Sequence, residues 1–480
     1  MNSLLSKVAA DVLGLDAQAE VVDLAGRRAM ATRTYLDSAA TCLMPAFVMR
    51  TMLDYLQTSQ ANSHTHANPS GRATTAALKT AHHALGLLVG YDPSVDCVVM
   101  LGTGATEPCN LLATALAADR GARPLAAVSI SEHHSNMLPW RRAFGEENVR
   151  YFDARADGTV DLDSLARLLE AEGDQIRVVA VTALSNVTGA ITPVAEIARM
   201  VHAAGAELAV DGAQAAAHVP LTMHPGSGGD IDYLVLSGHK LYAPGSPGAF
   251  VGNRRLFAKG GWSLGLVGGG TVDRVDLDQV QFHTDPSERF EAGTPNIPGT
   301  IGLGAAALVL RTIGMPSVRE HEQALVTLAL QELATVPGLE LFGPHDPSVR
   351  AGVMTFNVGD LPHSLVAAAL SDYFAICVRN DCFCAQPFVR QQLDAACEER
   401  GFCPIPTVEG KRGMVRASFG IYTRPEEIRF LAEALRWIVA NRAAIEPQYQ
   451  HDAEGEFRHA TFTAMPPFDL VAATSRGVGL

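Results

Sequence analysis

Residues 233–240 read Tyr-Leu-Val-Leu-Ser-Gly-His-Lys, an apolar run that ends in a lysine, and a Gly/Pro-rich turn follows at 243–248. The run predicts a buried strand, with Lys240 just beyond its carboxyl end. A lysine in a dry pocket loses its charge, and only the neutral amine attacks an aldehyde to form a Schiff base. Ser237 and His239, beside the lysine, could hold a phosphate. Four residues are a weak signal alone, so the rest of the chain must supply the context.

A second apolar run, at 207–210, ends in an acidic residue. Asp211 follows that run, about 29 positions before Lys240, and Gln214 lies three residues further on. An aspartate can keep a pyridine nitrogen protonated while a lysine binds the aldehyde of the same molecule. Together, Asp211 and Lys240 therefore indicate pyridoxal 5'-phosphate (PLP) chemistry.

Length and composition set the broad class of the protein. The chain has 480 residues, of which 48% are hydrophobic and 18% charged, so two or more globular domains are expected. The formal net charge of -14 argues against a general nucleic-acid binder, which needs a basic face. No run of 18 apolar residues is present, so no membrane span is expected. Residues 1–20 lack the features of a secretion signal and predict an amphipathic helix.

The eight cysteines do not predict a disulfide framework in a chain of this length. Several lie in apolar runs and are most simply small core residues, so a cytoplasmic location is expected. Cys382 and Cys384 have C-x-C spacing, which is not typical of a zinc knuckle or a thioredoxin motif. No metal site is expected.

From about residue 35 to 310, short apolar runs alternate with Ala-rich helical patterns. This alternation predicts an α/β fold with a mostly parallel sheet flanked by helices, which binds ligands at the carboxyl ends of its strands. Expected strands lie at 97–100, 125–130, 177–182, 207–210, 233–236 and 249–251, and expected helices at 74–89, 107–118, 162–172 and 194–204.

After Gly299 the pattern changes to two long helices, at 301–312 and 316–334, then strands at 352–358 and 375–378 and a final helix at 424–442. This pattern predicts a smaller α/β domain. The expected organisation is an N-terminal segment, 1–34, packing on the small domain, a large domain, 35–310, a small C-terminal domain, 311–444, and a tail, 445–480, with no assigned role.

Two loops after expected strands carry polar groups suited to the same pocket. Residues 102–107 read Gly-Thr-Gly-Ala-Thr-Glu, and a glycine-rich turn before a helix N-terminus can cradle a phosphate; an ordinary strand-to-helix turn is the alternative. Residues 131–136 read Ser-Glu-His-His-Ser-Asn, and a histidine there can stack on a flat cofactor and relay protons. The alternative for this loop is a polar turn with a capping serine.

Three further residues have a functional and a structural interpretation. Asn186 could donate its amide to a phenolic oxygen or a carboxylate, or could be a turn residue. Arg416, flanked by small and apolar residues, needs a ligand anion or a structural carboxylate partner. Cys384, after a strand and beside an expected helix start, could act as a thiolate or be an inert buried thiol.

Taken together, these motifs resemble the fold-type I PLP enzymes called class V aminotransferases, and among them the cysteine desulfurase/selenocysteine lyase family. The resemblance runs from Tyr35-Leu36-Asp37-Ser38-Ala39-Ala40-Thr41 to about Ile438. It is carried by the order of the motifs 132–136, 211–214, 237–242 and 289–296.

The resemblance implies a role for each matching position. Lys240 resembles the Schiff-base lysine, and His133 the stacking histidine. The other cofactor positions are Asp211 at the pyridine nitrogen, Gln214 near the phenolic oxygen, and Ala105, Thr106, Ser237 and His239 at the phosphate. Thr294 matches a threonine that reaches the phosphate of the neighbouring subunit, which implies a homodimer with active sites at the interface. Asn186, Arg379 and Arg416 fall at substrate positions, and Cys384 matches the cysteine that takes sulfur as a persulfide.

Three segments depart from the family pattern: residues 62–72, the four residues before Cys384, and a longer stretch from 385 to 415 that carries Cys397 and Cys403. All three are expected near the substrate or a sulfur acceptor, so they leave the substrate open and the cofactor unaffected.

Three hypotheses follow. The first is a PLP-dependent cysteine desulfurase-like enzyme that acts on an L-amino acid, forms alanine and passes sulfur to Cys384 and then to an acceptor protein. The second keeps PLP but catalyses another reaction, such as β-elimination, transamination, epimerisation or a step in specialised metabolism, with Cys384 not used as sulfur acceptor. The third is a non-catalytic sulfur-relay or regulatory protein.

Overall fold

The computed structural model describes residues 3–102, 104–258, 264–400, 412–465 and 468–478. Its centre is a seven-stranded sheet in the order β4-β10-β9-β8-β7-β5-β6. Strand β10 pairs antiparallel with both of its neighbours, and the other adjacent pairs are parallel. The strands are β4 (Asp96–Leu101), β5 (Leu125–Ser129), β6 (Val149–Phe152), β7 (Ile176–Thr182), β8 (Glu207–Asp211), β9 (Tyr233–Ser237) and β10 (Gly248–Asn253).

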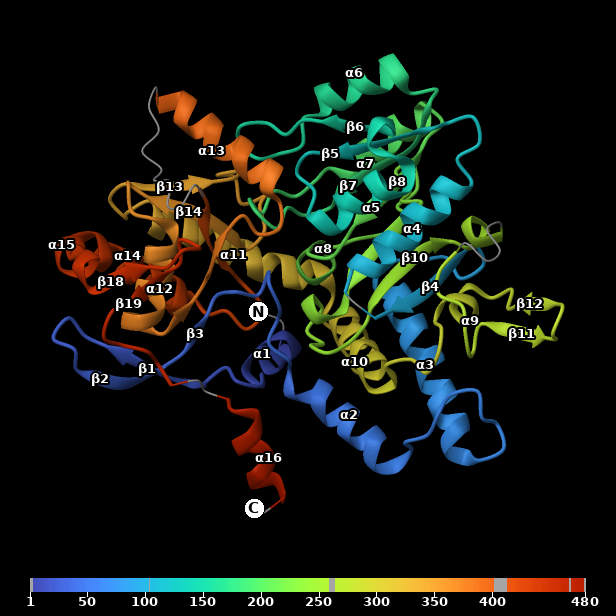
Figure 1. Ribbon diagram of the computed structural model, residues 1–480, viewed down its shortest axis with the longest axis horizontal. Helices are drawn as coiled ribbons and strands as arrows, with labels where there is room; N and C mark the ends of the chain where they lie inside the picture. The colour runs from blue at the N-terminus through green and yellow to red at the C-terminus, as the bar shows by residue number, and fades with distance from the viewer. Residues whose placement is uncertain (1–2, 103, 259–263, 401–411, 466–467, 479–480) are drawn as a thin grey trace.

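Helices surround this sheet, as Figure 1 shows. They are α2 (Ala46–Thr58), α3 (Pro69–Leu88), α4 (Thr106–Ala118), α5 (His134–Phe144), α6 (Leu162–Glu172), α7 (Val194–Ala203), α8 (Ala215–His218), α10 (Ile297–Ile313) and α11 (Met315–Leu333). Local sequence explains where several begin: the side chain of Asn68 accepts a hydrogen bond at the start of α3, and that of Asp161 does so at the start of α6. The predicted mostly parallel α/β architecture is confirmed.

Some elements differ from the sequence prediction. The N-terminal helix α1 covers only Ser3–Ala10, and strand β1 (Gln18–Val22) already lies within the segment 1–20 that was expected to be helical. Gly14, with φ 75°, turns the chain between them. The short edge strand β6 and helix α5, which contains Pro139, were not predicted. Strand β6 has only four residues of mixed polarity, which is too short for an alternating pattern to be recognised. In helix α5, the internal proline argues against a helix in the sequence.

The second half of the chain builds a smaller four-stranded antiparallel sheet, β13-β14-β17-β16. Its strands are β13 (Leu339–Phe342), β14 (Val353–Val358), β16 (Arg379–Asp381) and β17 (Met414–Ser418), with helices α12 (His363–Phe374) and α14 (Pro425–Ala440). Helix α11 joins the two parts, because Val318 packs in the core of the large sheet and Leu325 in the core of the small one. The domain boundaries at 34, 310 and 444 stay predictions.

The remaining elements connect or extend these two parts. They are β2 (Arg28–Thr32), β3 (Thr34–Tyr35), α9 (Pro286–Phe290), the hairpin β11 (Val272–Val275) and β12 (Val280–Phe282), β15 (Ile376–Cys377), α13 (Gln386–Arg400), α15 (Arg442–Ile445), β18 (Tyr449–His451), β19 (Phe457–His459) and α16 (Leu470–Val478). Over the described ranges, no single helix is long and apolar enough to span a membrane; α10 and α11 together reach that length and hydropathy, bent by 80°.

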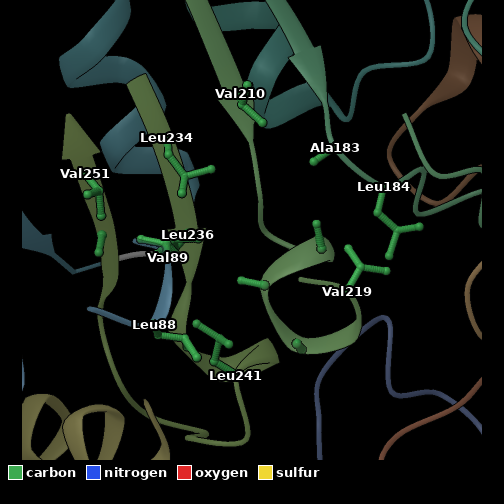
Figure 2. Close-up of a cluster of buried hydrophobic side chains, with 14 of the residues drawn as sticks. Leu88, Val89, Ala183, Leu184, Val210, Val219, Leu234, Leu236, Leu241 and Val251 are labelled. Carbon is green, nitrogen blue, oxygen red and sulfur yellow. The ribbon is translucent and has the colours of Figure 1, made fainter. Parts of the chain in front are cut away.

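A packed apolar core lies beneath the carboxyl ends of β8 and β9. Figure 2 shows part of it: Val210 on β8, Leu234 and Leu236 on β9 and Val251 on β10 belong to the same cluster as Leu241, which directly follows Lys240 and lies beside Leu88. All of these side chains are buried. Because packed side chains occupy this side of the turn, the lysine backbone has little freedom to move. The core therefore holds the two residues that the sequence singled out, Asp211 and Lys240.

Candidate active site

A cavity of about 200 Å³ opens at the carboxyl ends of β8 and β9. It brings together all but one of the residues predicted for the site. Its lining includes Ala105, Thr106, His133, Asn186, Asp211, Gln214, Ser237, His239, Lys240, Arg379, Cys384 and Arg416. Since these residues come from both sheets, the cavity lies where the two parts of the chain meet.

Lys240 ends the 3₁₀ turn Gly238–Lys240 that follows β9. Burial lowers the pKa of its amine, and the nearby guanidiniums of Arg416 and Arg379 act in the same direction, whereas Asp211 opposes them. The lysine backbone is also anchored, because the Cys42 thiol donates to the Lys240 carbonyl at 3.0 Å. The amine is therefore held in place and biased toward its neutral, nucleophilic form.

Asp211 is the last residue of β8 and is only 4% exposed. One carboxylate oxygen accepts a hydrogen bond from the Ala213 N–H at 2.9 Å. Burial raises the pKa of this carboxyl, while the Ala213 N–H and the Lys240 amine counteract the rise. A buried carboxylate of this kind gains stability from a cation beside it, such as a protonated ring nitrogen.

His133 stands just before α5 and caps that helix. Its Nδ1 accepts a hydrogen bond from the Ser135 N–H at 3.1 Å, so the ring proton lies on Nε2. Burial, together with the positive charge of Lys240, lowers the pKa of His133 to about 3. The ring is therefore neutral near pH 7 and forms part of the cavity lining.

The N-terminus of α4 forms an anion cradle with the residues after β9. Gly104 leaves the space open, because a Cβ there would lie 3.1 Å from Ser237 Oγ and 3.6 Å from His239 Nε2. Gln214 also lines the cavity: its Oε1 is buried with no hydrogen-bond partner among the described residues, although its Nε2 donates to the Ala39 carbonyl at 2.8 Å. A cradle for an anion, an orphaned acceptor, a buried carboxylate and a lysine whose pKa is lowered together fit PLP.

Arg416, on β17, is 2% exposed and faces the cavity from the small sheet. Its guanidinium donates to the Asn186 carbonyl at 2.9 Å and to Asp37 Oδ1 at 3.2 Å. Burial lowers its pKa to about 10, so it is still a cation near pH 7. The Nε atom has no hydrogen-bond partner in the part of the chain that the structure describes, which leaves donor capacity for a bound carboxylate.

Cys384 lies on a turn between β16 and α13. The residue is exposed and lines the cavity, and its thiol is free. Asp381, Phe383 and Cys384 all have positive φ values, of 91°, 53° and 56°, which non-glycine residues rarely adopt. Phe383 is nonetheless buried, with its ring 4.8 Å from the Arg416 guanidinium.

Two predicted elements lie elsewhere. Thr294 is exposed and does not line the Lys240 cavity. Ser63, His64 and His66, from the segment that departs from the family pattern, line a separate cavity of about 380 Å³ with His82. These three residues of the segment therefore do not line the Lys240 cavity of their own chain, and the expected place of the segment near the substrate stays a prediction. Of the 385–415 stretch, 386–400 form α13, while Cys403 lies outside the described residues; Cys397 takes part in a disulfide bond.

The structure adds residues that sequence reasoning missed. Asp37 pairs with Arg416, and its place in the motif 35–41 was the available signal. Glu132 is fully buried, accepting from the Thr182 N–H at 2.7 Å and from Asn136 Nδ2 at 2.6 Å. It therefore ties the start of α5, and with it His133, to the end of β7. Nothing in the sequence indicated that this glutamate is buried.

Comparison with known families identifies the chain. Residues 34–431 match the family model described as aminotransferase class-V. The chain belongs to the class V aminotransferase family. Curated relatives include cysteine desulfurases of Serratia proteamaculans, 31% identical over 409 residues (84% of this chain and 93% of the relative), and of Dickeya dadantii, 33% identical over 410 residues (84% and 91%).

Solved structures agree. The chain is similar to the apo cysteine desulfurase of Thermococcus onnurineus, with a TM-score of 0.73 and 29% identity over 85% of this chain and 95% of that one. It is also similar to the cysteine desulfurase CsdA of Escherichia coli, with a TM-score of 0.72 and 27% identity over 91% and 98%. These similarities confirm the predicted fold-type I architecture and the resemblance to the desulfurases.

Proposed function

We propose that this class V protein is a PLP-dependent cysteine desulfurase. The observation that carries the proposal is the meeting of Lys240, Arg416 and Cys384 in one cavity: an amine for the cofactor, a cation for a substrate carboxylate and a thiol for sulfur. Desulfurases related over most of the chain support it. When bound, PLP supplies a reactive aldehyde and an electron-accepting ring.

Lys240 is the proposed proton carrier, and His133 is the proposed stacking residue. With its pKa lowered, the Lys240 amine can both bind an aldehyde and, once free, take a proton from the substrate Cα. Asp211 balances the charge at the far end of the cofactor site. His133 holds its proton on Nε2, and its ring lines the same cavity, where it would stack on the bound cofactor.

Arg416 is the proposed carboxylate anchor. Its guanidinium is already oriented by the Asn186 carbonyl and Asp37, so binding a substrate carboxylate costs little further ordering. Arg379, at the edge of the small sheet, adds a second positive charge to the same cavity. Orientation by Arg416 would direct the substrate side chain toward the turn that carries Cys384.

Cys384 is the proposed sulfur acceptor. Its sulfur attacks the sulfur of the substrate cysteine; the new S–S bond forms as the substrate C–S bond breaks, and the carbon skeleton takes up a proton and leaves as alanine. The net change converts cysteine and one thiol into alanine and one persulfide, so no outside oxidant or reductant is needed. An acceptor protein would then take the sulfur from the persulfide.

A homodimer is part of the proposal. Thr294 is exposed and lies outside the cavity of its own chain, so a phosphate that it holds would belong to a second copy. The oligomeric state follows from light scattering, and Thr294→Ala should weaken cofactor retention without altering the Lys240 cavity. A cytoplasmic location and the acceptor's identity stay predictions.

The decisive experiment compares the wild type with Cys384→Ala. Each protein is incubated with cysteine, the persulfide is trapped by alkylation and located by mass spectrometry, and alanine is measured. We expect persulfide on Cys384 of the wild type and none on the variant, whose cofactor absorbance should be unchanged.

Sulfur release by Cys384→Ala at the wild-type rate would overturn the role of Cys384. A panel of cysteine, cysteine sulfinate, selenocysteine and sulfur-free amino acids, assayed for sulfide, alanine, pyruvate and α-proton exchange, tests the reaction itself. Pyruvate or α-proton exchange without alanine would indicate a different PLP reaction in the same pocket.

A further inference from the structure

The adjacent histidines His133 and His134 serve two different neighbours. Their ring centroids lie 6.3 Å apart with planes at 46°, so the rings do not stack on each other. His133 lines the Lys240 cavity, whereas the ring of His134 reaches the turn before α13. One dipeptide on the large sheet therefore contacts both the cofactor site and the segment that carries Cys384.

Two hydrogen bonds connect His134 to that turn. The His134 N–H donates to the Cys384 carbonyl at 2.7 Å, and His134 Nε2 accepts from the Gln386 N–H at 3.3 Å. Gln386 is the first residue of α13, where backbone N–H groups have no partner within the helix. The histidine ring thus supplies the acceptor that the helix start lacks, while the His134 backbone N–H holds the Cys384 carbonyl just before it.

The turn needs such external support. Asp381, Phe383 and Cys384 hold left-handed backbone conformations that are unfavourable for residues with a Cβ. Apart from the backbone contacts, side chains from elsewhere restrain it: Asn186 Nδ2 donates to the Phe383 carbonyl at 2.9 Å, and His134 holds Gln386. A strained turn keeps its conformation only while contacts from the surrounding residues hold it. Removing one of these contacts should therefore let the Cys384 side chain occupy several positions.

We propose that His134 is a positioning residue for Cys384, and that its ring fixes the turn so that the thiol points into the Lys240 cavity. This inference rests on the proposed desulfurase function and goes beyond it by assigning the element that aims the sulfur acceptor. His134 itself touches neither the substrate nor the cofactor in this role.

The test compares His134→Phe with His134→Gln in the holoenzyme. Phenylalanine keeps the volume but removes the acceptor, whereas the glutamine carbonyl can still accept from the Gln386 N–H. Because one lost hydrogen bond corresponds to about a tenfold change, we expect His134→Phe to slow single-turnover persulfide formation about 10-fold. His134→Gln should stay within about 3-fold of the wild type, and both should keep the wild-type KM for cysteine and the cofactor absorbance.

A second variant removes the donor instead of the acceptor. Gln386→Pro deletes the N–H at the first position of a helix, where proline is well tolerated. If the contact is the cause, the double variant His134→Phe/Gln386→Pro should be no slower than either single variant. His83→Phe, a matched change on α3 where His83 bonds Tyr91, is the control and should leave persulfide formation unchanged.

The alkylation rate of Cys384 by iodoacetamide provides an independent readout and should rise in His134→Phe, because a freed thiol is more accessible. Equal persulfide rates for His134→Phe and the wild type, or equal losses for His134→Phe and His134→Gln, would overturn the inference. Failure of the proposed function is distinguishable from this outcome, because the wild type itself would then form no persulfide.

Discussion

The two halves of the proposed active site are held in different ways. Asp211 and Lys240 stand at the ends of buried strands above a packed core, so the sheet itself places them. Cys384 stands on an exposed turn with left-handed residues, placed by contacts from His134 and Asn186. The position of the proposed cofactor residues Asp211 and Lys240 thus depends on the strands that carry them. The position of the proposed sulfur acceptor Cys384 depends on a few side chains from other segments.

Lys240→Ala should have the largest effect and tests the half placed by the sheet. Without the amine, neither cofactor attachment nor proton transfer at Cα is possible, so alanine formation should fall by about 10⁴-fold or more. Steady-state alanine production measures it. The unfolding transition should stay near that of the wild type, because the side chain's charge is unfavourable in its buried position; residual activity within tenfold of the wild type would contradict the assignment.

Phe383→Ala should have the next largest effect, and it tests whether packing of this ring stabilises the turn that carries Cys384. The ring is 4% exposed and packs in a cluster with Phe388 and Met414, so its loss should reduce the free energy of unfolding by about 3 kcal/mol. Urea denaturation measures this change. Phe383→Leu, which keeps most of the volume, is the matched control and should lose less than half as much; equal losses would show that packing is not the cause.

Arg416→Lys tests the join between the two halves. A lysine keeps the charge but cannot hold the Asn186 carbonyl, Asp37 and a substrate carboxylate at once. We expect the KM for cysteine to rise about 30-fold with a smaller change in kcat, as for loss of a charge-assisted contact. A change confined to kcat would place Arg416 in the chemical step instead.

The smallest expected effect is on the pH dependence of stability, and it comes from the ion pair of His82 with Glu291, three residues before Thr294. Burial lowers the pKa of His82, but the Glu291 carboxylate at 2.7 Å outweighs it and leaves the pKa raised above 6.5. The pair's contribution is therefore complete below pH 6.5 and is lost as the pH rises through the folded-state pKa. Unfolding free energies at pH 6 and 9 should differ less in His82→Asn than in the wild type, by about 1 kcal/mol or less; an identical pH slope would contradict this.

The predictable parts of the fold were those with strong local patterns. Most of helices α3, α4 and α6 and the central buried strands follow from apolar periodicity, and so do the ends of β8 and β9, although the start of α3 at Pro69 lies five residues before the predicted one. The edge strand β6, helix α5 with its proline and the true extent of α1 did not follow, because short or interrupted patterns are ambiguous.

Within the site, order along the chain was sufficient to predict which residues gather around Lys240, and the cavity contains twelve of them. It was not sufficient for the partners that orient them. Asp37 on Arg416, Glu132 behind His133 and His134 on the Cys384 turn are contacts between segments far apart in sequence.

The amino-acid sequence by itself determined the α/β architecture and the family, because strand periodicity and the residues of each motif can be read along the chain; it also singled out Lys240 and Asp211 as the proposed cofactor residues. Only the tertiary structure decided that Thr294 lies outside the cavity of its own chain, that Ser63, His64 and His66 line a different cavity, and that Cys384 lines the Lys240 cavity from a strained turn. These outcomes depend on how segments that are distant in sequence pack together, and local sequence patterns do not specify which side chains from such segments come into contact.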